Sequence, residues 1–185
     1  MAEYYLISQL PSLDGLSETA NLPITQTAFM ELCRRFLNRK TAAELEKLTL
    51  IPPRTPQRSS SALVERWNEG ESRLRLALAK LRAEKMNKPF AAEEQTVAPG
   101  ILQAARAAVE IESPLDAEKF LSRYRLAFLE TLRPMDLFSE EYLFYYGLKL
   151  MLLERLRQFD LERGEAAYQH IYDSIMNEDR SEVVQ

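Results

Sequence analysis

The sequence predicts an all-α protein, a bundle of about six to seven helices, and three observations carry that prediction. Leucine, alanine, glutamate, arginine and lysine dominate the composition, and these residues favour helices. Only 5 of the 185 residues are glycine, fewer than turn-rich β folds usually need. Between Tyr142 and Leu153, every residue except Gly147 and Lys149 is apolar. A helix this apolar on nearly every face has to be surrounded by other helices, and it is too short and too closely flanked by charge to span a membrane.

Charge is unevenly distributed along the chain, although the net charge is only −4. Residues 31–88 carry 14 Lys and Arg against 7 Glu, a balance of +7, whereas residues 89–185 carry 10 Lys and Arg against 18 acids, a balance of −8. A basic middle and an acidic end can bind partners of opposite charge or pair with each other. Solvated charged faces are the simplest explanation.

The first 50 residues are expected to form a short apolar segment and two helices. Residues 3–10 are apolar and end at Pro11, and this length does not distinguish a buried strand from one or two helical turns. A helix is predicted over 25–38, and Thr41 with Glu44 fits a capping box that opens the next short helix. The apolar stripe of the helix over 25–38 comprises Phe29, Leu32, Cys33, Phe36 and Leu37.

A proline-containing loop over 52–61 separates these helices from a long basic helix over 62–86. Gly70 in the middle of this helix marks a bend or a close helix crossing, since glycine costs about 1 kcal/mol against alanine there. Glu71 and Arg75 form an i,i+4 pair in the favourable orientation. The inward stripe of the long helix comprises Leu63, Trp67, Leu74, Leu78 and Leu81.

Two further helices are predicted after a connector over 87–99. The first, over 100–111, is rich in alanine and is expected to pack closely through Ala104, Ala105, Ala107 and Ala108. The second begins at a strong start signal, with Ser113 as the cap, Pro114 at the first helical position and Asp116 at the third. Its buried residues are expected to be Phe120, Leu121, Tyr124, Phe128 and Leu132.

The apolar run belongs to a central helix from Ser139 to about Asp160, around which the other helices are expected to pack. Ser139 is placed to cap it, and Glu140 and Glu141 suit the positive end of its dipole. After a turn near Gly164, a last helix carries Ala167, Tyr168, Ile171, Tyr172 and Ile175.

The domain prediction has four parts: an N-terminal lobe over 1–88, a connector with the alanine-rich helix over 89–112, a C-terminal lobe over 113–178 and a frayed tail over 179–185. One compact domain is the alternative.

An internal similarity is compatible with two related helical hairpins. Pro23 and Phe29 are six residues apart, and so are Pro114 and Phe120. Coincidence among leucine-rich helices explains the same match.

No catalytic, cofactor-binding or metal-binding residue is predicted. Five scattered glycines cannot form a phosphate-binding loop, and one cysteine with one histidine falls short of a zinc site. His170 lies in a helical pattern, where a surface or interfacial histidine is the simpler explanation than a catalytic base. Cys33 lies in an apolar stripe, where a buried, inert thiol is the default. Ala167 stands three residues before His170, so the Glu-x-x-His motif of a carboxylate di-metal bundle fails.

The basic helix over 62–86 is the predicted partner-binding element, through Arg66, Arg73, Arg75, Arg82 and Lys85. Trp67 shares the stripe of Leu74 and Leu78, which favours core packing over stacking on nucleic-acid bases. We therefore expect a protein partner and no nucleic acid.

Three segments resemble a little-characterised bacterial family that is encoded beside subunits of V-type (A/V-type) rotary ATPases. They are YYLISQLPSL (4–13), RWNEGESRLRLALAKLRAEK (66–85), and SPLDAEKFLSRYRLAFLETL (113–132) followed by YLFYYGLKLMLLERLRQFDLERG (142–164). The resemblance implies an all-helical accessory or structural component, and more distantly a likeness to the ATPase C (d-type) subunit, which couples the central stalk to the membrane ring. The present chain is too short for the three helical units of that subunit.

The expected function is that of a non-catalytic accessory protein of a V-type ATPase, on its central-stalk or membrane-ring side, or of its assembly. The alternatives are a generic helical adaptor, a nucleic-acid-binding helical protein, and an enzyme with a cleft of carboxylates and arginines. The single cysteine fits a reducing compartment, and the first ten residues lack the basic region and apolar run of a signal peptide. We expect a cytoplasmic protein that reaches the inner membrane only through its partner.

Overall fold

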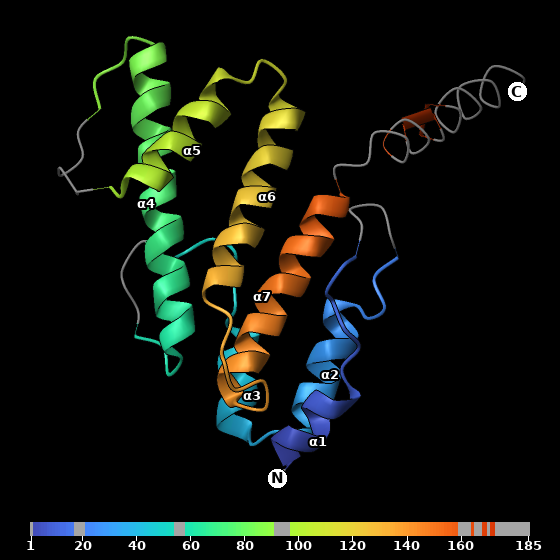
Figure 1. Cartoon of the computed structure of the whole chain (residues 1–185). Coiled ribbons are helices and arrows are strands. Elements are labelled where there is room, and N and C mark those ends of the chain that lie inside the picture. The colour runs from blue at the N-terminus through green and yellow to red at the C-terminus, as the bar shows by residue number, and fades with distance from the viewer. Residues whose placement is uncertain are drawn as a thin grey trace, which may run out of the picture.

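The computed structural model describes residues 2–16, 21–53, 58–90 and 97–158, together with Gly164, Tyr168, Gln169, Ile171 and Tyr172. Across these ranges the chain forms α helices and no strand, which confirms the all-α prediction (Figure 1). The helices are α1 (Ala2–Gln9), α2 (Gln26–Phe36), α3 (Arg39–Glu46), α4 (Ala62–Lys85), α5 (Pro99–Glu110), α6 (Pro114–Thr131) and α7 (Glu140–Arg157).

Helix α7 is the centre of the bundle, as its composition predicts. All eight residues over 143–150 are buried, so no face of this stretch is open to solvent. Figure 1 shows α7 between α6 and α2, and it also contacts α3 and α4. Burial on every side explains why its apolar residues follow no helical period.

One carboxylate of α7 satisfies the start of α4, which lies about eighty residues earlier in the chain. Glu141 accepts hydrogen bonds from the backbone N–H groups of Ala62 and Leu63, each at 3.2 Å. It also accepts from the hydroxyl of Ser61, the N-cap of α4, at 2.7 Å. The first N–H groups of a helix lack partners within the helix and carry its positive dipole end, so a carboxylate stabilises them.

Helices α2 and α3 are held to α7 in a similar way. Glu154 accepts from the backbone N–H of Gln26, the first residue of α2, at 2.8 Å. Glu140 accepts from the hydroxyl of Thr41 in the first turn of α3, at 3.0 Å. Acids on α7 therefore lie at the amino ends of three separate helices.

Helix starts are predicted well where the signal is local, with two corrections. Ser113 accepts from the N–H of Asp116 as expected. The capping box at Thr41 is wrong, because α3 begins at Arg39 and Asn38 is its cap, accepting from the N–H of Thr41 at 2.9 Å. Ser139 precedes α7, but its hydroxyl donates to the carbonyl of Asp136 at 2.7 Å and does not cap the helix.

The segment 3–10 is a helix and not a strand, since α1 covers most of it. Its residues Leu6 and Ile7 are buried in the core, whereas Tyr4 and Tyr5 are more than half exposed. The helix is short and is held by packing against α2.

Buried apolar side chains form two clusters, which lie at different positions along the long helices α4 and α6. The division between the clusters does not coincide with the predicted domain boundaries at residues 88 and 112. The larger cluster joins α1, α2, α3 and α7 with the first half of α4 and the end of α6. The smaller cluster joins the second half of α4 with α5 and the first half of α6. Helices α4 and α6 therefore run through both clusters.

The buried residues predicted for α4 and α5 are largely confirmed, whereas those predicted for α6 are mostly only partly buried. In α4 the buried residues of the predicted stripe are Leu63, Trp67, Leu74 and Leu78, whereas Leu81 is only partly buried. In α6, Leu121 is buried as predicted. The predicted residues that are only partly buried are Ala107 in α5 and, in or just after α6, Phe120, Tyr124, Phe128 and Leu132.

Gly70 marks a close helix crossing, one of its two predicted meanings. A Cβ atom added there would lie 2.4 Å from Cζ of Phe128 on α6. The ring of Phe128 also stacks on Trp67, with centroids 6.0 Å apart. Glycine lets the two helices approach over that ring.

The two segments that suggested related hairpins lie differently in their helices. Phe29 is the fourth residue of α2, whereas Phe120 is the seventh residue of α6. Phe29 is fully buried, and Phe120 is only partly so.

The last predicted helix lies largely outside the described residues, and so do His170 and the tail over 179–185. Tyr168, Gln169, Ile171 and Tyr172 are helical and exposed. Among the described residues, no helix combines the length and hydropathy needed to cross a bilayer.

Candidate functional site

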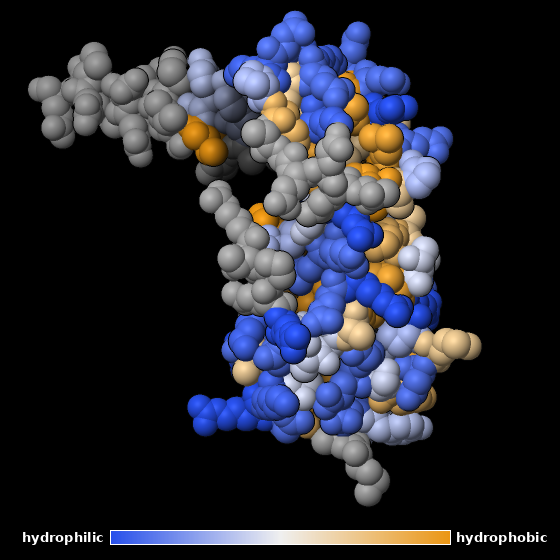
Figure 2. Space-filling view, turned by 90° about the vertical axis from the view of Figure 1, so that its left-hand side faces the viewer, coloured by the Kyte–Doolittle hydropathy of each residue, from blue (hydrophilic) through white to orange (hydrophobic). Residues whose placement is uncertain are grey.

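The predicted partner-binding residues do not form one patch, because helix geometry divides them. At 100° per residue, Arg66 and Arg73 share one side of α4, and Arg75 and Arg82 lie on the opposite side. The rise of the helix places Arg66 and Arg82 about 24 Å apart along its axis. Figure 2, which views the side of α4 and α5, shows hydrophilic residues spread over this side with hydrophobic residues between them.

Three members of the predicted set make contacts within the protein. Arg75 donates to Glu71 at 2.8 Å, which confirms the predicted i,i+4 pair, and Lys85 donates to the carbonyl of Val109 on α5 at 3.0 Å. Arg73 pairs with Glu69 at 2.6 Å on the surface. Arg66, Arg82 and Lys85 are exposed, whereas Arg73 and Arg75 are partly buried.

Glu71 is the centre of a buried ionic network that the sequence did not indicate. Its carboxylate is almost fully buried and accepts two hydrogen bonds from the guanidinium of Arg125 on α6, at 2.9 and 3.0 Å. Glu118, about two turns earlier on α6, lies 3.9 Å from Arg125 and accepts from Arg155 on α7 at 3.3 Å. The network joins α4, α6 and α7, and its oppositely charged groups are compensated in place.

A second ionic cluster surrounds Lys149, the one charged residue in the apolar run of α7. Its ammonium donates to Asp14 at 2.5 Å, to Glu130 at 2.6 Å and to the hydroxyl of Tyr145 at 3.2 Å. Arg133 lies 3.2 Å from the other oxygen of Asp14. The cluster ties the loop after α1 to the end of α6 and the middle of α7.

The electrostatics of this cluster fix its members in their charged forms. Burial alone would lower the pKa of Lys149, but hydrogen bonds to Asp14, Glu130 and Tyr145 raise it. The hydrogen bond from Lys149 lowers the pKa of Asp14. Burial would raise the pKa of Glu130, but its hydrogen bonds from Lys149 and Tyr145 lower it.

An amine held in the charged form by two carboxylates is a poor nucleophile and a poor general base. Burial and the bond to Glu130 raise the pKa of Tyr145 to about 12, so its hydroxyl stays protonated as a donor. The chemistry of the cluster is therefore that of a structural ion pair.

Cys33 and Trp67 lie where their patterns predict. Cys33 is fully buried in α2, and burial raises the pKa of its thiol to about 12, which leaves almost no reactive thiolate near neutral pH. Trp67 is fully buried in α4, so its ring is not available to stack on a nucleic-acid base.

Two of the clefts on the described surface are lined by polar side chains, several of which are paired within the protein. The larger, about 630 Å³, lies between the start of α2 and the end of α7. Its Glu154 holds the N–H of Gln26, and its Arg157 donates to Asn21 at 3.2 Å. The smaller, about 160 Å³, lies between the end of α3 and the start of α4.

No cluster of three or more His, Cys, Asp or Glu side chains able to hold a metal ion occurs within the described ranges.

The most distinctive surface lies at the end of the molecule formed by α1 and the loop between α6 and α7, and the sequence analysis missed it. Five large apolar residues are exposed there, and we call them the end face: Tyr4, Tyr5, Met135, Leu137 and Phe138. Tyr4 stacks on Phe138 with ring centroids 4.3 Å apart, which joins α1 to the loop. Met135 is fully exposed. Exposed apolar patches of this kind mark interaction sites more often than isolated apolar residues do.

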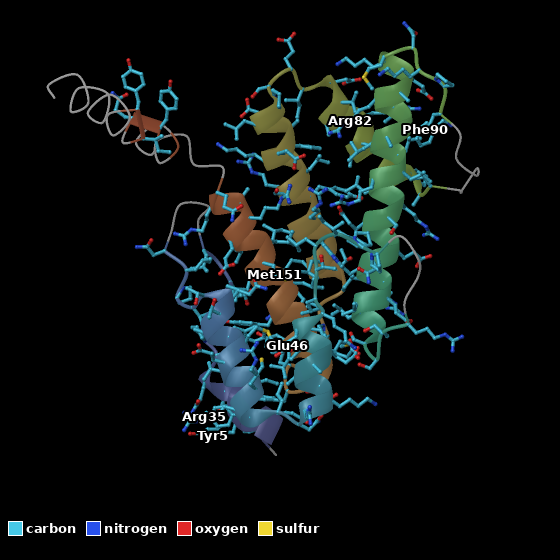
Figure 3. The ribbon with its side chains drawn as sticks, turned by 180° about the vertical axis from the view of Figure 1, so that it is seen from behind. Tyr5, Arg35, Glu46, Arg82, Phe90 and Met151 are labelled. Atoms are coloured by element: carbon cyan, nitrogen blue, oxygen red, sulfur yellow. The ribbon has the colours of Figure 1, made fainter. Side chains whose placement is uncertain are left out.

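Charged side chains of both signs lie at this end of the molecule, since Glu3 precedes Tyr4, Asp136 is exposed between Met135 and Leu137, and Arg35 lies near Phe36. Tyr5 packs against Phe36 at the end of α2, and the guanidinium of Arg35 lies 5.4 Å from the ring of Phe36. Figure 3 shows Tyr5 and Arg35 side by side at this end, whereas Arg82 lies at the other end of the molecule. Arg39 and Lys40, at the start of α3, are also exposed. The aromatic residues Tyr4, Tyr5 and Phe138 were the signal available in the sequence. To use it, one had to know that these two distant segments lie together in the fold.

Compared with models of known protein families, with curated proteins and with solved structures, the chain shows no match.

Proposed function

We propose that this chain is a non-catalytic helical binding protein, an accessory or structural component of a V-type rotary ATPase or of its assembly. The observation that carries the binding role is the end face. It gathers aromatic and aliphatic residues from two distant segments, and tyrosine, phenylalanine and methionine are enriched where proteins bind one another.

The use of charge inside the protein supports the same proposal. Lys149 and Glu71, two of the buried charged residues, each pair with a residue of another helix. The acids of α7 satisfy helix starts. These groups are committed to architecture, which leaves the surface as the place where the protein acts.

The ATPase as the partner is supported by the resemblance of residues 4–13, 66–85, 113–132 and 142–164 to the family encoded beside its subunits. The first of these segments contains Tyr4 and Tyr5 of the end face. In this proposal the protein is cytoplasmic and reaches the membrane through the ATPase.

The test is affinity purification of the tagged chain from the native cell, with ATPase subunits identified in the eluate. The variant Tyr4→Ala/Phe138→Ala should lose them, because it removes the stacked pair at the centre of the end face. The matched control is Ile51→Ala/Phe90→Ala, which removes two exposed apolar side chains elsewhere and should retain the subunits. Recovery of every ATPase subunit without this chain, in the reciprocal purification, would refute the proposed partner.

A further inference from the structure

Two buried polar side chains of α6 keep hydrogen-bonding atoms that no described residue pairs. Among the described residues, the polar or charged side chains that are buried are Thr41, Ser61, Glu71, Ser122, Arg125 and Lys149. All of them make side-chain hydrogen bonds except Ser122, whose hydroxyl oxygen has no partner, and Arg125 is paired at only one side of its guanidinium. A buried polar atom without a partner loses its hydration and gains nothing in return, so such atoms indicate bound solvent or an ion.

The position of the Arg125 guanidinium is fixed by Glu71 on α4. Its Nε and Nη2 atoms donate to the two carboxylate oxygens of Glu71, at 2.9 and 3.0 Å. Because the guanidinium is planar and its donors fan outward, the N–H groups of Nη1 point away from Glu71. On that side, Oε2 of Glu118 lies 3.9 Å from Nη1, which is too far for a direct hydrogen bond.

Glu118, Ser122 and Arg125 lie in one row along α6. They occupy positions i, i+4 and i+7 of the helix, so their side chains share one side, and successive members have Cβ atoms about 5–6 Å apart. Ser122 is fully buried, whereas the side chain of Glu118 is 34% exposed. The row therefore runs from the surface into the interior, and a small molecule can enter beside Glu118.

The three side chains define the chemistry of the molecule that suits this row. Arg125 offers a donor, Glu118 offers an acceptor, and the hydroxyl of Ser122 can act as either. An anion would be repelled by Glu118 and a cation by Arg125, which leaves a neutral molecule that both accepts and donates. Water has these properties, it commonly bridges polar groups more than 3.5 Å apart, and about three partners are typical of a buried water.

We propose that α6 binds one ordered water molecule between Glu118, Ser122 and Arg125. The water accepts a hydrogen bond from Nη1 of Arg125, donates one to Glu118 and forms a third with the hydroxyl of Ser122. It completes the ionic network, because Glu118 also accepts from Arg155 on α7 at 3.3 Å, and Arg125 holds Glu71 on α4. The water is thus a structural ligand at the junction of three helices, and this inference is independent of the proposed partner.

Magnetic relaxation dispersion of the solvent tests the site, because it counts water molecules that stay bound to the purified full chain for long times. Ser122→Val replaces the hydroxyl by a methyl group that cannot hydrogen-bond, and this variant is expected to hold one long-lived water fewer than the wild type. Thr131→Val is the matched control. It removes an exposed hydroxyl from the same helix and should keep the wild-type number. Circular dichroism checks that both variants retain the helical fold.

A high-resolution crystal structure of the wild type gives a second test that does not depend on the variant folding. Density for one water is expected within about 2.7–3.2 Å of Arg125 Nη1, Glu118 and the hydroxyl of Ser122. Crystals soaked in bromide should show no anomalous signal there.

Three results would overturn the inference. One is an equal number of long-lived waters in the wild type and in folded Ser122→Val. Another is a direct hydrogen bond between Arg125 Nη1 and Glu118 with no density between them. The third is bromide bound at the site, which would assign it to an anion instead.

Discussion

At the scale of single residues, the decisive feature is that buried charges are compensated by side chains from other helices. Lys149 would be costly to bury alone in the most apolar helix of the chain, and Asp14 and Glu130 remove that cost. The sequence showed Lys149 as an exception within its apolar run, but its partners lie 135 and 19 positions away. Spacing rules reach only neighbouring turns, so neither ionic cluster could be predicted.

Asp14 should make stability depend on pH. Its pKa lies below the ordinary value of 3.8, so its ionised form contributes stability that is present above that value and is lost as pH falls through the lowered pKa. Asp14→Asn should reduce the free energy of unfolding at pH 7 by less than about 1 kcal/mol, because the carboxylate is half exposed. It should also flatten the loss of stability as pH falls below about 4.

Urea unfolding at several pH values measures this effect. Glu112→Gln, a neutral substitution at an exposed acid before α6, is the control and should keep the wild-type slope. Equal slopes in wild type and Asp14→Asn would contradict the assigned role of Asp14.

Glu71 and Arg125 should show strong coupling in a double-mutant cycle. Glu71→Met leaves the buried guanidinium of Arg125 without its two-bond partner and should cost about 3–5 kcal/mol. The double variant Glu71→Met/Arg125→Met should cost clearly less than the sum of the single changes, since it removes both charges together. Chemical denaturation of the four proteins gives the coupling energy, and simple additivity would argue against a buried pair.

At the scale of elements, local signals predicted helix starts and helix extents, and long-range contacts decided the exceptions. Ser113 with Pro114 is a complete local signal and was predicted correctly. The Thr41 box failed because Asn38 is a competing cap three residues earlier, and Thr41 instead donates to Glu140 on α7. Segment 3–10 was ambiguous because one or two turns carry too little periodicity to identify a helix.

Gly70→Ala should destabilise the protein, although alanine is the better helix former. Its methyl group would lie 2.4 Å from the Phe128 ring, and such overpacking costs about 1–3 kcal/mol. Gly100→Ala is the matched control, because no atom lies within 4 Å of its Cβ position, and it should stabilise by about 0.4–1 kcal/mol. Thermal unfolding compares the two, and Phe128→Leu should partly rescue Gly70→Ala.

Glu141→Ala should weaken the start of α4 from a distance. It removes the acceptor for Ser61, Ala62 and Leu63, and loss of such a cap costs about 1–2 kcal/mol. Glu141→Gln keeps an acceptor but loses the charge, so its cost should be smaller. Hydrogen exchange should localise the loss of protection to the first turn of α4, and a uniform loss across the molecule would contradict this role.

At the scale of the whole molecule, the two apolar clusters share α4 and α6 and should unfold together. Leu148→Ala in the larger cluster and Leu121→Ala in the smaller should each cost about 2–5 kcal/mol, because both side chains are fully buried. Both variants should shift one common transition, with far-ultraviolet circular dichroism and Trp67 fluorescence coinciding. A separate early transition in either variant would show that the clusters are independent.

The candidate site was less predictable than the fold because it depends on contacts between segments that are distant in the sequence. A helix period identifies which residues face inward, and it predicted the burial of Trp67 and Cys33 correctly. It does not reveal which exposed residues of distant segments lie together. The arginines of α4 looked like one group in sequence but divide between two sides, whereas Tyr4 and Phe138 looked unrelated and stack.

The placement of α7 at the amino ends of earlier helices has a consequence for synthesis. During translation, α2, α3 and α4 leave the ribosome long before α7, since Glu154 follows Gln26 by 128 positions and Glu141 follows Ser61 by 80. Until then their apolar stripes have no central helix to cover them, and exposed stripes of this kind aggregate readily. The nascent chain therefore depends on chaperones, or on fast elongation, until its last large helix emerges.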